Sequence, residues 1–348
     1  MKKLMAMLMA LVLVFSMIAC AKDEAAPVTD ETVEETTEEV AEETTEEVTE
    51  EPIELNVFVL SGPTGIGAAN MMAASDAGEL EQGYNFTVAA MPDEIVGKIV
   101  NGDADIAAIA TNLASKVYTK TEGGITVLGV NTLGVLSMLE MEQTVETVAD
   151  LAGKTIYTSG QGANPQFILE YVLRANGLDP ETDVTIVYKT ENAELATVFA
   201  EDPEAVIMAP HPVATSIMIN SGAVISLDMT KEWEAVSQDS ALMMGCIVVR
   251  NEVLENNPAA VAAFMADYAA SIEAANTDPA TTGTHCETYG IVAKAALATK
   301  AIPQCNIVWV TGEEMKTQLS GYLQVLFEAD PASVGGKVPE DSFYYVAE

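Results

Sequence analysis

The chain has 348 residues, 49% of them hydrophobic and 20% charged, and its 53 acidic residues against 15 basic ones give a formal net charge of −38 at pH 7. No cluster of Lys and Arg follows the first few residues, which argues against nucleic acid as a partner, because phosphate backbones are bound through basic side chains. The acidic excess favours solubility and leaves the identity of any ligand open.

The first 20 residues have the pattern of an export signal. Two lysines precede an uncharged apolar stretch, residues 4–19, which fits the core of a signal peptide and is shorter than the roughly 20 residues that span a bilayer. It ends in MIAC at residues 17–20, which resembles a bacterial lipobox. We therefore expect residues 1–19 to form a lipoprotein signal peptide and Cys20 to be lipidated, anchoring the protein outside the cytoplasmic membrane. An ordinary signal peptide with an incidental Cys is the alternative.

A Thr/Glu repeat follows the lipobox. Residues 23–51 contain 14 acidic residues and no basic ones, so they repel one another and bury too little apolar surface to fold. The sequence predicts a disordered acidic tether over residues 20–52, between the anchor and the folded part. A tail that binds a metal or a partner is the alternative.

Three cysteines remain in the folded part. Cys246 lies in the apolar run LMMGCIVVR and is expected to be buried in a strand. Cys286 and Cys305 flank an amphipathic segment, and outside the cytoplasm a disulfide between them is expected. Two free thiols are the alternative.

From residue 53 the chain alternates short β-branched runs with longer Ala-rich segments, which is typical of an α/β fold. The predicted strands are 54–60, 85–89, 106–108, 126–130, 135–140, 155–157, 185–188, 205–209, 223–226, 242–249 and 306–310. The predicted helices are 67–77, 92–101, 111–119, 147–152, 165–176, 193–201, 213–220, 231–236, 258–276 and 286–301.

A folded part of this length favours two lobes, because single cores stop growing near 250–300 residues. The apolar segments NTLGVLSMLE (131–140) and ALMMGCIVVR (241–250) lack a helix between themselves and a sequence neighbour, which suits strands that cross between lobes. The expected division is residues 53–135 plus 244–348 for lobe 1 and 136–243 for lobe 2. Each lobe is predicted to hold a mostly parallel sheet flanked by helices.

The glycine-rich loop SGPTGIG (61–67) connects the first predicted strand to a helix. It is not a nucleotide-binding P-loop, because Ala68 and Ala69 stand where that motif needs Lys and Ser or Thr. A G-x-G-x-x-G dinucleotide fingerprint is absent from it as well. The loop alone leaves two alternatives, a plain turn or a site for a small ligand.

Three motifs carry a resemblance to a known family. They are MPDEIVGKIVNGDADIAAIATNLASKVYTK (91–120), LAGKTIYTSGQGANPQFILEYVLRANGLDP (151–180) and APHPVAT (209–215). With these motifs the chain resembles the solute-binding lipoproteins of bacterial ABC importers, in the nitrate/sulfonate/taurine (NMT1/THI5-like) group, over about residues 53–345. The resemblance implies a monomer with the two-lobed type II periplasmic-binding-protein (Venus flytrap) fold. Such a protein grips a small solute between its lobes and delivers it to a permease in the membrane.

Under this resemblance the ligand contacts lie in loops at the carboxyl ends of strands, where open α/β sheets bind ligands. Three residues have a simpler alternative as helix caps, namely Thr111, Asn112 and Asn164, and His211 has one as a packed or solvated residue. The predicted contacts are Ser61, Thr64, Gly65, Thr111, Asn112, Ser159, Gly160, Gln161, Asn164 and His211.

These loops contain no Arg or Lys, so they lack the usual partners of a carboxylate or phosphate. A small neutral or zwitterionic polar molecule is therefore the first expectation, and a sulfonate-like anion the second. No cofactor, metal or catalytic residue is predicted, because the two His residues lie far apart in sequence and no His, Cys and carboxylate group has metal-ligand spacing. The alternatives are a THI5-like pyrimidine-forming or other small-molecule enzyme, and a lipid-anchored sensor that feeds no transporter.

Overall fold

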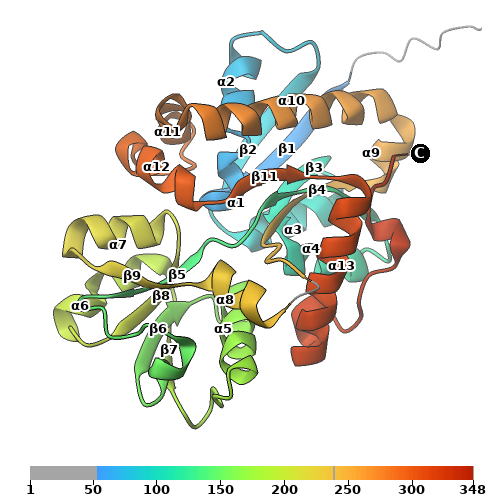
Figure 1. Cartoon of the computed structure of the whole chain (residues 1–348). Helices are drawn as coiled ribbons and strands as arrows, with labels where there is room; N and C mark the ends of the chain where they lie inside the picture. Colours follow the sequence, from blue (N-terminus) through green and yellow to red (C-terminus); the bar gives the residue numbers. More distant parts are fainter. Residues whose placement is uncertain (1–52, 238–239, 348) are drawn as a thin grey trace, which may run out of the picture. The chain divides into compact units, whose positions relative to one another are not determined.

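Two mixed β-sheets flanked by helices make up the described part of the chain, residues 53–237 and 240–347 of a computed structural model (Figure 1). The predicted signal peptide, the lipidated Cys20 and the acidic tether lie outside these residues. The α/β class and the two-lobed architecture predicted from the sequence are confirmed.

Among the described residues the first sheet has six strands in the order β11-β4-β10-β3-β1-β2. The edge-side strand β1 has the sequence ELNVFVL, and its buried positions alternate with more exposed ones, as expected for a strand covered mainly on one face. Strand β4, next to the edge strand β11, is buried at every position. The strands are β1 (Glu54–Leu60), β2 (Gly83–Ala89), β3 (Ile106–Ala110), β4 (Ile125–Thr132), β10 (Gly245–Arg250) and β11 (Ile307–Val310).

The second sheet has five strands within the described ranges, in the order β7-β6-β8-β5-β9. Its central strands β5 and β8 are apolar and almost completely buried, whereas the edge strand β7 is only partly covered. The strands are β5 (Leu136–Glu140), β6 (Thr155–Ser159), β7 (Thr185–Lys189), β8 (Val206–Pro210) and β9 (Val224–Asp228).

Both sheets are mixed: most strands of each sheet run in one direction, as predicted, and antiparallel pairs occur beside the parallel ones. In the first sheet β1 pairs parallel with β2 and β3, but β10 runs antiparallel between β3 and β4. In the second sheet β6 pairs parallel with β7 and β8, but β5 runs antiparallel between β8 and β9. The antiparallel pairs involve β5 and β10, which are the first strands that the chain forms on entering a sheet from the other lobe, and the edge strand β11, which runs antiparallel to β4.

The two crossovers follow from these strands. The chain leaves the first sheet after Thr132 and enters the second at Leu136, and it comes back into the first sheet at Gly245. The return segment is tied to α4, since the backbone N–H of Thr111 donates to the carbonyl of Met244 at 3.2 Å. The apolar runs 131–140 and 241–250 therefore connect the lobes as predicted.

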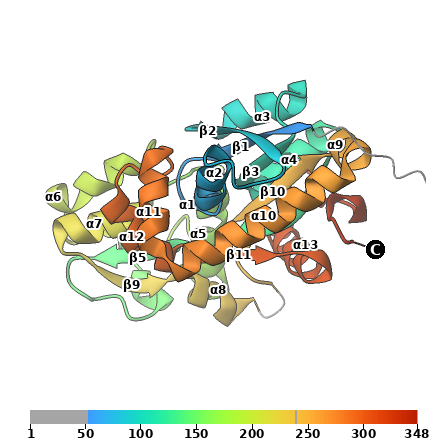
Figure 2. The same ribbon diagram turned by 90° about the horizontal axis from the view of Figure 1, so that it is seen from above.

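The helices cover the faces of the sheets, and Figure 2 shows α10 lying along the first sheet beside α2 and α11. No helix among the described residues is both long enough and apolar enough to cross a membrane. The α-helices are α1 (Pro63–Ile66), α2 (Ala69–Asp76), α3 (Pro92–Asn101), α4 (Thr111–Lys120), α5 (Asn164–Ala175), α6 (Val198–Glu201), α7 (Val213–Ser221), α8 (Met229–Val236), α9 (Asn251–Asn256), α10 (Pro258–Thr277), α11 (Pro279–Thr288), α12 (Ala295–Ala301) and α13 (Gly312–Ala329). The 3-10 helices are η1 (Val148–Leu151), η2 (Asn192–Thr197), η3 (Ile302–Gln304), η4 (Pro331–Val334) and η5 (Asp341–Phe343).

One long helix, α13, was not predicted. Its buried residues are Met315, Leu319, Tyr322, Leu323 and Leu326, which recur at helical spacing on one face. Each large apolar side chain that is fully buried there contributes about 1.5–3 kcal/mol. The pattern was therefore present in the sequence, although no element was assigned after residue 310.

The segment predicted as one helix, 286–301, is divided in the structure. Helix α11 ends at Thr288 and α12 begins at Ala295. Gly290 has φ 71° in the turn between them, a conformation that other residues rarely adopt. The turn brings Ile291 and Val292 into buried positions facing the second lobe.

The cysteines also differ from the expectation. Cys286 and Cys305 are buried free thiols in the structure, so the predicted disulfide is not formed. Burial raises the pKa of the Cys286 thiol to about 12, and burial together with the neighbouring Cys286 raises the pKa of Cys305. Both groups are therefore protonated and pack as small apolar side chains. Cys246 is buried in β10, as predicted.

Candidate functional site

The glycine-rich loop at the end of β1 is shaped by its own hydrogen bonds. Gly62 has φ 93°, and its N–H donates to the carbonyl of Ile291 at 2.8 Å. The N–H of Gly65 donates to the carbonyl of Gly62 at 3.1 Å, and that of Gly67 to the carbonyl of Gly65. The N–H of Gly65, one of the predicted contacts, is thus used within the turn, while Ser61 is exposed and Thr64 half-buried.

Asn131, at the end of β4, connects this loop to the core of the first lobe through two hydrogen bonds. Its Nδ2 donates to the carbonyl of Thr64 at 2.9 Å and to the hydroxyl of Tyr268 at 2.8 Å. Asn131 is buried, so both bonds are protected from water. It is a positioning residue that the sequence reasoning missed, because nothing local relates it to the loop 67 residues away.

The polar residues at the end of β3 point into the first lobe. The Thr111 hydroxyl donates to the carbonyl of Met243 in the return crossover. The Asn112 Nδ2 donates to the carbonyl of Ser333 in η4 at 3.4 Å, and both side chains are buried. Their contacts within the lobe favour a structural role over direct contact with a ligand.

The loop after β6 joins the second lobe to the first. The Asn164 Nδ2 donates to the carbonyl of Met244 at 3.3 Å, the same carbonyl that accepts from Thr111. The Oδ1 of Asn164 is buried and has no hydrogen-bond partner among the described residues. Gly160 has φ 77° in this loop, and Gln161 is exposed. The carbonyl of Met244 is therefore a common anchor for loops from both lobes.

His211, at the end of β8, is a packed core residue. Its Nε2 lies 3.1 Å from the hydroxyl of Ser137 and its Nδ1 lies 2.7 Å from that of Thr215. Burial lowers the pKa of His211 to about 4, so the ring is neutral at pH 7. Both nitrogens are engaged inside the second lobe, which agrees with the simpler of the two sequence interpretations.

A pocket of about 350 Å³ lies between the two lobes, beside these loops. Its first-lobe lining comes from the end of β1 and from the α11–α12 turn, and its second-lobe lining comes from η2 and the start of α7. The first lobe supplies Gly62, Ile291, Val292, Ala293 and Leu297. The second lobe supplies Asn192, Ala193, Ala196, Pro212, Ser216 and Ile217, with Val213 beside them.

The predicted contact residues do not line this pocket themselves. None of the ten is among the described lining residues, but Gly62 and Pro212 directly follow Ser61 and His211. The Ser159 hydroxyl donates to Oδ1 of Asn192, and Asn192 does line the pocket. Sequence reasoning missed Asn192 and Ile291, although the first follows a predicted strand and the second follows the helix-breaking Gly290.

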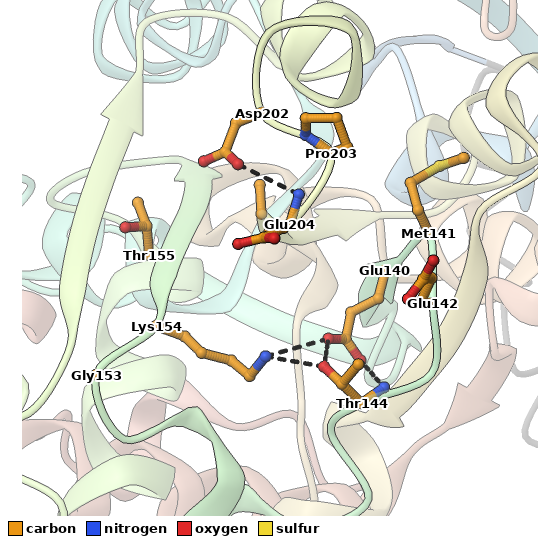
Figure 3. A pocket seen from close by; sticks show the side chains of 11 residues that line it. Glu140, Met141, Glu142, Thr144, Gly153, Lys154, Thr155, Asp202, Pro203 and Glu204 are labelled. Atoms are coloured by element: carbon orange, nitrogen blue, oxygen red, sulfur yellow. Dashed lines mark hydrogen bonds and ion pairs between the residues drawn. The ribbon is translucent and has the colours of Figure 1, made fainter.

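A larger, polar pocket of about 570 Å³ lies elsewhere, at the edge of the second sheet where β5 ends and β6 begins (Figure 3). Its carboxylates are Glu140, Glu142, Asp202 and Glu204. Figure 3 shows Lys154 extending toward Glu140, and the Nζ to Oε1 distance is 3.7 Å. Strands β6 and β8 begin beside this pocket. The pocket therefore lies at the opposite end of these strands from the loops at their carboxyl ends.

The carboxylate of Glu140 is buried, and neighbouring groups compensate its charge. Its carboxylate accepts hydrogen bonds from the Thr144 hydroxyl at 2.7 Å and from the backbone N–H of Val145 at 3.0 Å. These bonds and Lys154 satisfy the charge internally. Among residues 53–237 and 240–347, no group of three or more His, Cys, Asp and Glu side chains is placed to hold a metal ion.

Solved structures of similar fold cover most of the chain. An ABC transporter protein from Parabacteroides distasonis matches with a TM-score of 0.70 at 21% identity, covering 84% of this chain and 98% of that one. The periplasmic aliphatic sulphonate binding protein SsuA from Escherichia coli matches with a TM-score of 0.66 at 13% identity, covering 86% and 94%. The alkanesulfonate-binding protein SsuA from Xanthomonas axonopodis pv. citri, bound to MOPS, gives 0.61 at 14% identity, covering 85% and 97%. Identities this low establish the fold alone.

The sequence comparisons give the family. No curated protein matches the chain significantly. The profile of the family described as NMT1/THI5 like matches residues 87–282, which is more than half of the chain. This stretch contains all of the second sheet and the motifs at 91–120, 151–180 and 209–215 on which the resemblance was based. The chain belongs to the NMT1/THI5-like family.

Proposed function

We propose that this protein is an extracytoplasmic solute-binding lipoprotein, which captures a small polar organic molecule between its lobes and delivers it to an ABC import permease. The observation that carries the proposal is the pocket to which both lobes contribute, at the loops that follow β1 and β8. A ligand held there contacts both lobes at once, so its binding energy favours the closed arrangement over an open one.

The connection between the lobes supports this mechanism. The segment that passes from the first sheet to the second is short, because only three residues separate β4 from β5. Hinge closure of this kind is absorbed by a few residues at the ends of elements. The family match and the similar fold of ABC-transporter binding proteins also support the proposal. The proposal includes lipidation at Cys20 and a monomeric state.

The side chains favour binding over catalysis. His211 has both ring nitrogens occupied within the second lobe. Cys246 is buried in β10, and burial raises the pKa of its thiol, so the nucleophilic thiolate is disfavoured. Neither residue has the exposed position next to a base that a nucleophile or general base needs.

Within the proposed site the predicted residues have different roles. Ser61, Thr64 and Gln161 are exposed or half-buried and remain available to a solute. Ser159 acts through Asn192, and Asn164 acts by holding the return crossover at Met244. Thr111, Asn112 and His211 support the loops from within each lobe.

Mass spectrometry of small molecules released from the purified protein tests the proposal directly. We expect a defined organic solute that rebinds to the stripped protein and raises its melting temperature, because a ligand bound only by the folded state stabilises that state. X-ray scattering of the stripped and loaded protein should show a smaller radius of gyration with solute. If no solute is released, and if neither the melting temperature nor the radius of gyration changes when small-molecule extracts of cells are added, the function is not solute capture.

Uptake into vesicles that contain the cognate permease separates transport from sensing. Import that depends on the lipidated protein supports delivery to a permease. Solute binding without import would leave a lipid-anchored sensor instead.

A further inference from the structure

The chemistry of the interlobe pocket narrows the class of solute. Its deepest lining residues are Ile217, Ile291 and Val292, with relative exposures of 1%, 2% and 6%. Alanines at positions 193, 196 and 293 form its exposed margin. Such walls stabilise a hydrocarbon surface, because its burial against them removes it from water. At about 350 Å³ the pocket is at the small end of the range for organic ligands.

The pocket offers few polar groups. Among the described residues that line it, only Asn192 and Ser216 contribute polar side chains. An amide and a hydroxyl can each donate and accept, so they match an uncharged polar group such as an amide, a hydroxyl or a ring nitrogen. Because the Oδ1 of Asn192 already accepts from Ser159, the Nδ2 of Asn192 is left to donate to an acceptor on the solute.

No charge faces the pocket from its walls, because none of the twelve described residues that line it is ionisable. The carboxylates nearest in sequence, Glu191 and Glu194, accept hydrogen bonds from backbone N–H groups in the capping box of η2. Lys294 precedes α12 and is exposed, outside the lining. An anion or cation placed in this pocket would lose hydration without gaining a partner of opposite charge from the lining, which is unfavourable.

We propose that the solute is an uncharged molecule with a hydrocarbon body, which lies against Ile217, Ile291 and Val292 while its polar group meets Asn192 and Ser216. The inference rests on the proposed solute-binding function. It separates this chain from the sulfonate-binding proteins of similar fold, whose ligand is an anion. Selectivity arises here from the absence of a cation in the pocket as much as from its apolar contacts.

Matched probe pairs test the proposal on the full chain. Benzamide and benzenesulfonate share one hydrocarbon body and differ in the charge of the polar group, while acetamide and methanesulfonate lack most of that body. At millimolar concentration we expect benzamide to raise the melting temperature by a few degrees. Acetamide should have a smaller effect, and both sulfonates should have none. A shift from benzenesulfonate equal to or larger than that from benzamide would overturn the proposal, as would no shift from any probe.

Two variants, each with one alanine replaced by phenylalanine, test whether the solute binds in this pocket. Ala196→Phe places a ring at the margin of the pocket, and Ala200→Phe places the same ring on exposed α6, outside the lining. Calorimetric affinity for benzamide should fall by about tenfold or more in Ala196→Phe, since the phenyl group takes up the apolar space. Ala200→Phe should bind as the natural chain does. Equal affinities in the two variants would exclude this pocket.

The solute released from the purified protein separates this inference from the function on which it rests. An anionic solute that closes the lobes and binds equally to Ala196→Phe would leave solute capture standing and exclude the apolar pocket. A protein that releases no solute and shows no closure would remove the function itself. An uncharged solute whose affinity falls in Ala196→Phe supports both.

Discussion

The hydroxyl of Ser159 donates to Oδ1 of Asn192, 33 positions further along the chain. This bond connects the loop after β6 with η2, and η2 lines the interlobe pocket. Ser159 is buried and Asn192 is exposed at the pocket margin. A residue predicted from sequence as a ligand contact therefore sets the orientation of a second residue that is in position to make the contact.

Replacing Ser159 by Ala should weaken solute binding with little loss of fold. The amide of Asn192 then loses its partner, and the affinity for the solute identified by mass spectrometry should fall roughly fivefold, the equivalent of one hydrogen bond. Calorimetry measures the change. Ser226→Ala is the matched control, because its hydroxyl donates to Met138 at 3.4 Å and lies outside the pocket lining. Equal affinities in the two variants would contradict the role given to Ser159.

A Cβ at Gly65 should destabilise the protein. A methyl group there would lie 2.2 Å from the carbonyl oxygen of Leu60, a backbone atom that cannot move aside alone. Gly65→Ala should therefore lower the free energy of unfolding by about 2 kcal/mol or more. Gly97→Ala is the control in α3, where the new Cβ would meet nothing within 4 Å and helix propensity should add about 0.5–1 kcal/mol. Urea unfolding measures the free energy of unfolding of both variants. A change of the same sign in the two variants would refute the steric argument.

The buried His211 should make stability fall with pH below neutrality. Its pKa is lowered from 6.5 to about 4 by burial, so between these values the unfolded chain binds a proton that the folded chain does not. The stabilisation is complete above pH 6.5 and is lost as the pH falls toward 4, by on the order of 3 kcal/mol. Urea midpoints across this range measure it. His211→Gln should have a smaller slope, and an unchanged slope would assign the dependence to other groups.

The ion pair between Arg250 and Asp105 should contribute more to the stability of the fold than the exposed pair between Lys98 and Asp103. Arg250 Nη2 lies 3.0 Å from Asp105 Oδ1, and the side chains are 20% and 13% exposed. Asp105 also accepts from the backbone N–H of Asn56 at 2.9 Å, which ties β10 to the start of β3 and to β1. Arg250→Ala should cost about 3 kcal/mol, because it leaves a largely buried carboxylate without its counter-charge.

Lys98→Ala is the control for that variant. The Lys98 to Asp103 pair is 3.0 Å long, but its side chains are 49% and 53% exposed, so water screens the attraction. Its loss should cost less than about 1 kcal/mol. Denaturation in urea at low and at high salt compares the two, and equal losses would show that burial does not set the strength of these pairs.

Much of the fold could be predicted because its signals are local. The alternation in β1, the apolar runs of the two crossovers and the proline at the start of α3 each act within a few residues. The unassigned helix α13 and the break at Gly290 also had local signals, in helical spacing and in a turn-forming glycine. These were errors of interpretation, since the physical information was present in the sequence.

The sequence by itself determined the α/β class, the passage of the chain between two lobes and the position of polar loops at strand ends. Only the tertiary structure decided which polar groups those loops leave free. Asn112 finds its acceptor 221 residues away in η4, and Thr111 finds its acceptor 132 residues away in the return crossover. A hydroxyl or amide has the same local pattern whether it bonds to protein or to solute, so the choice depends on neighbours that folding alone brings together.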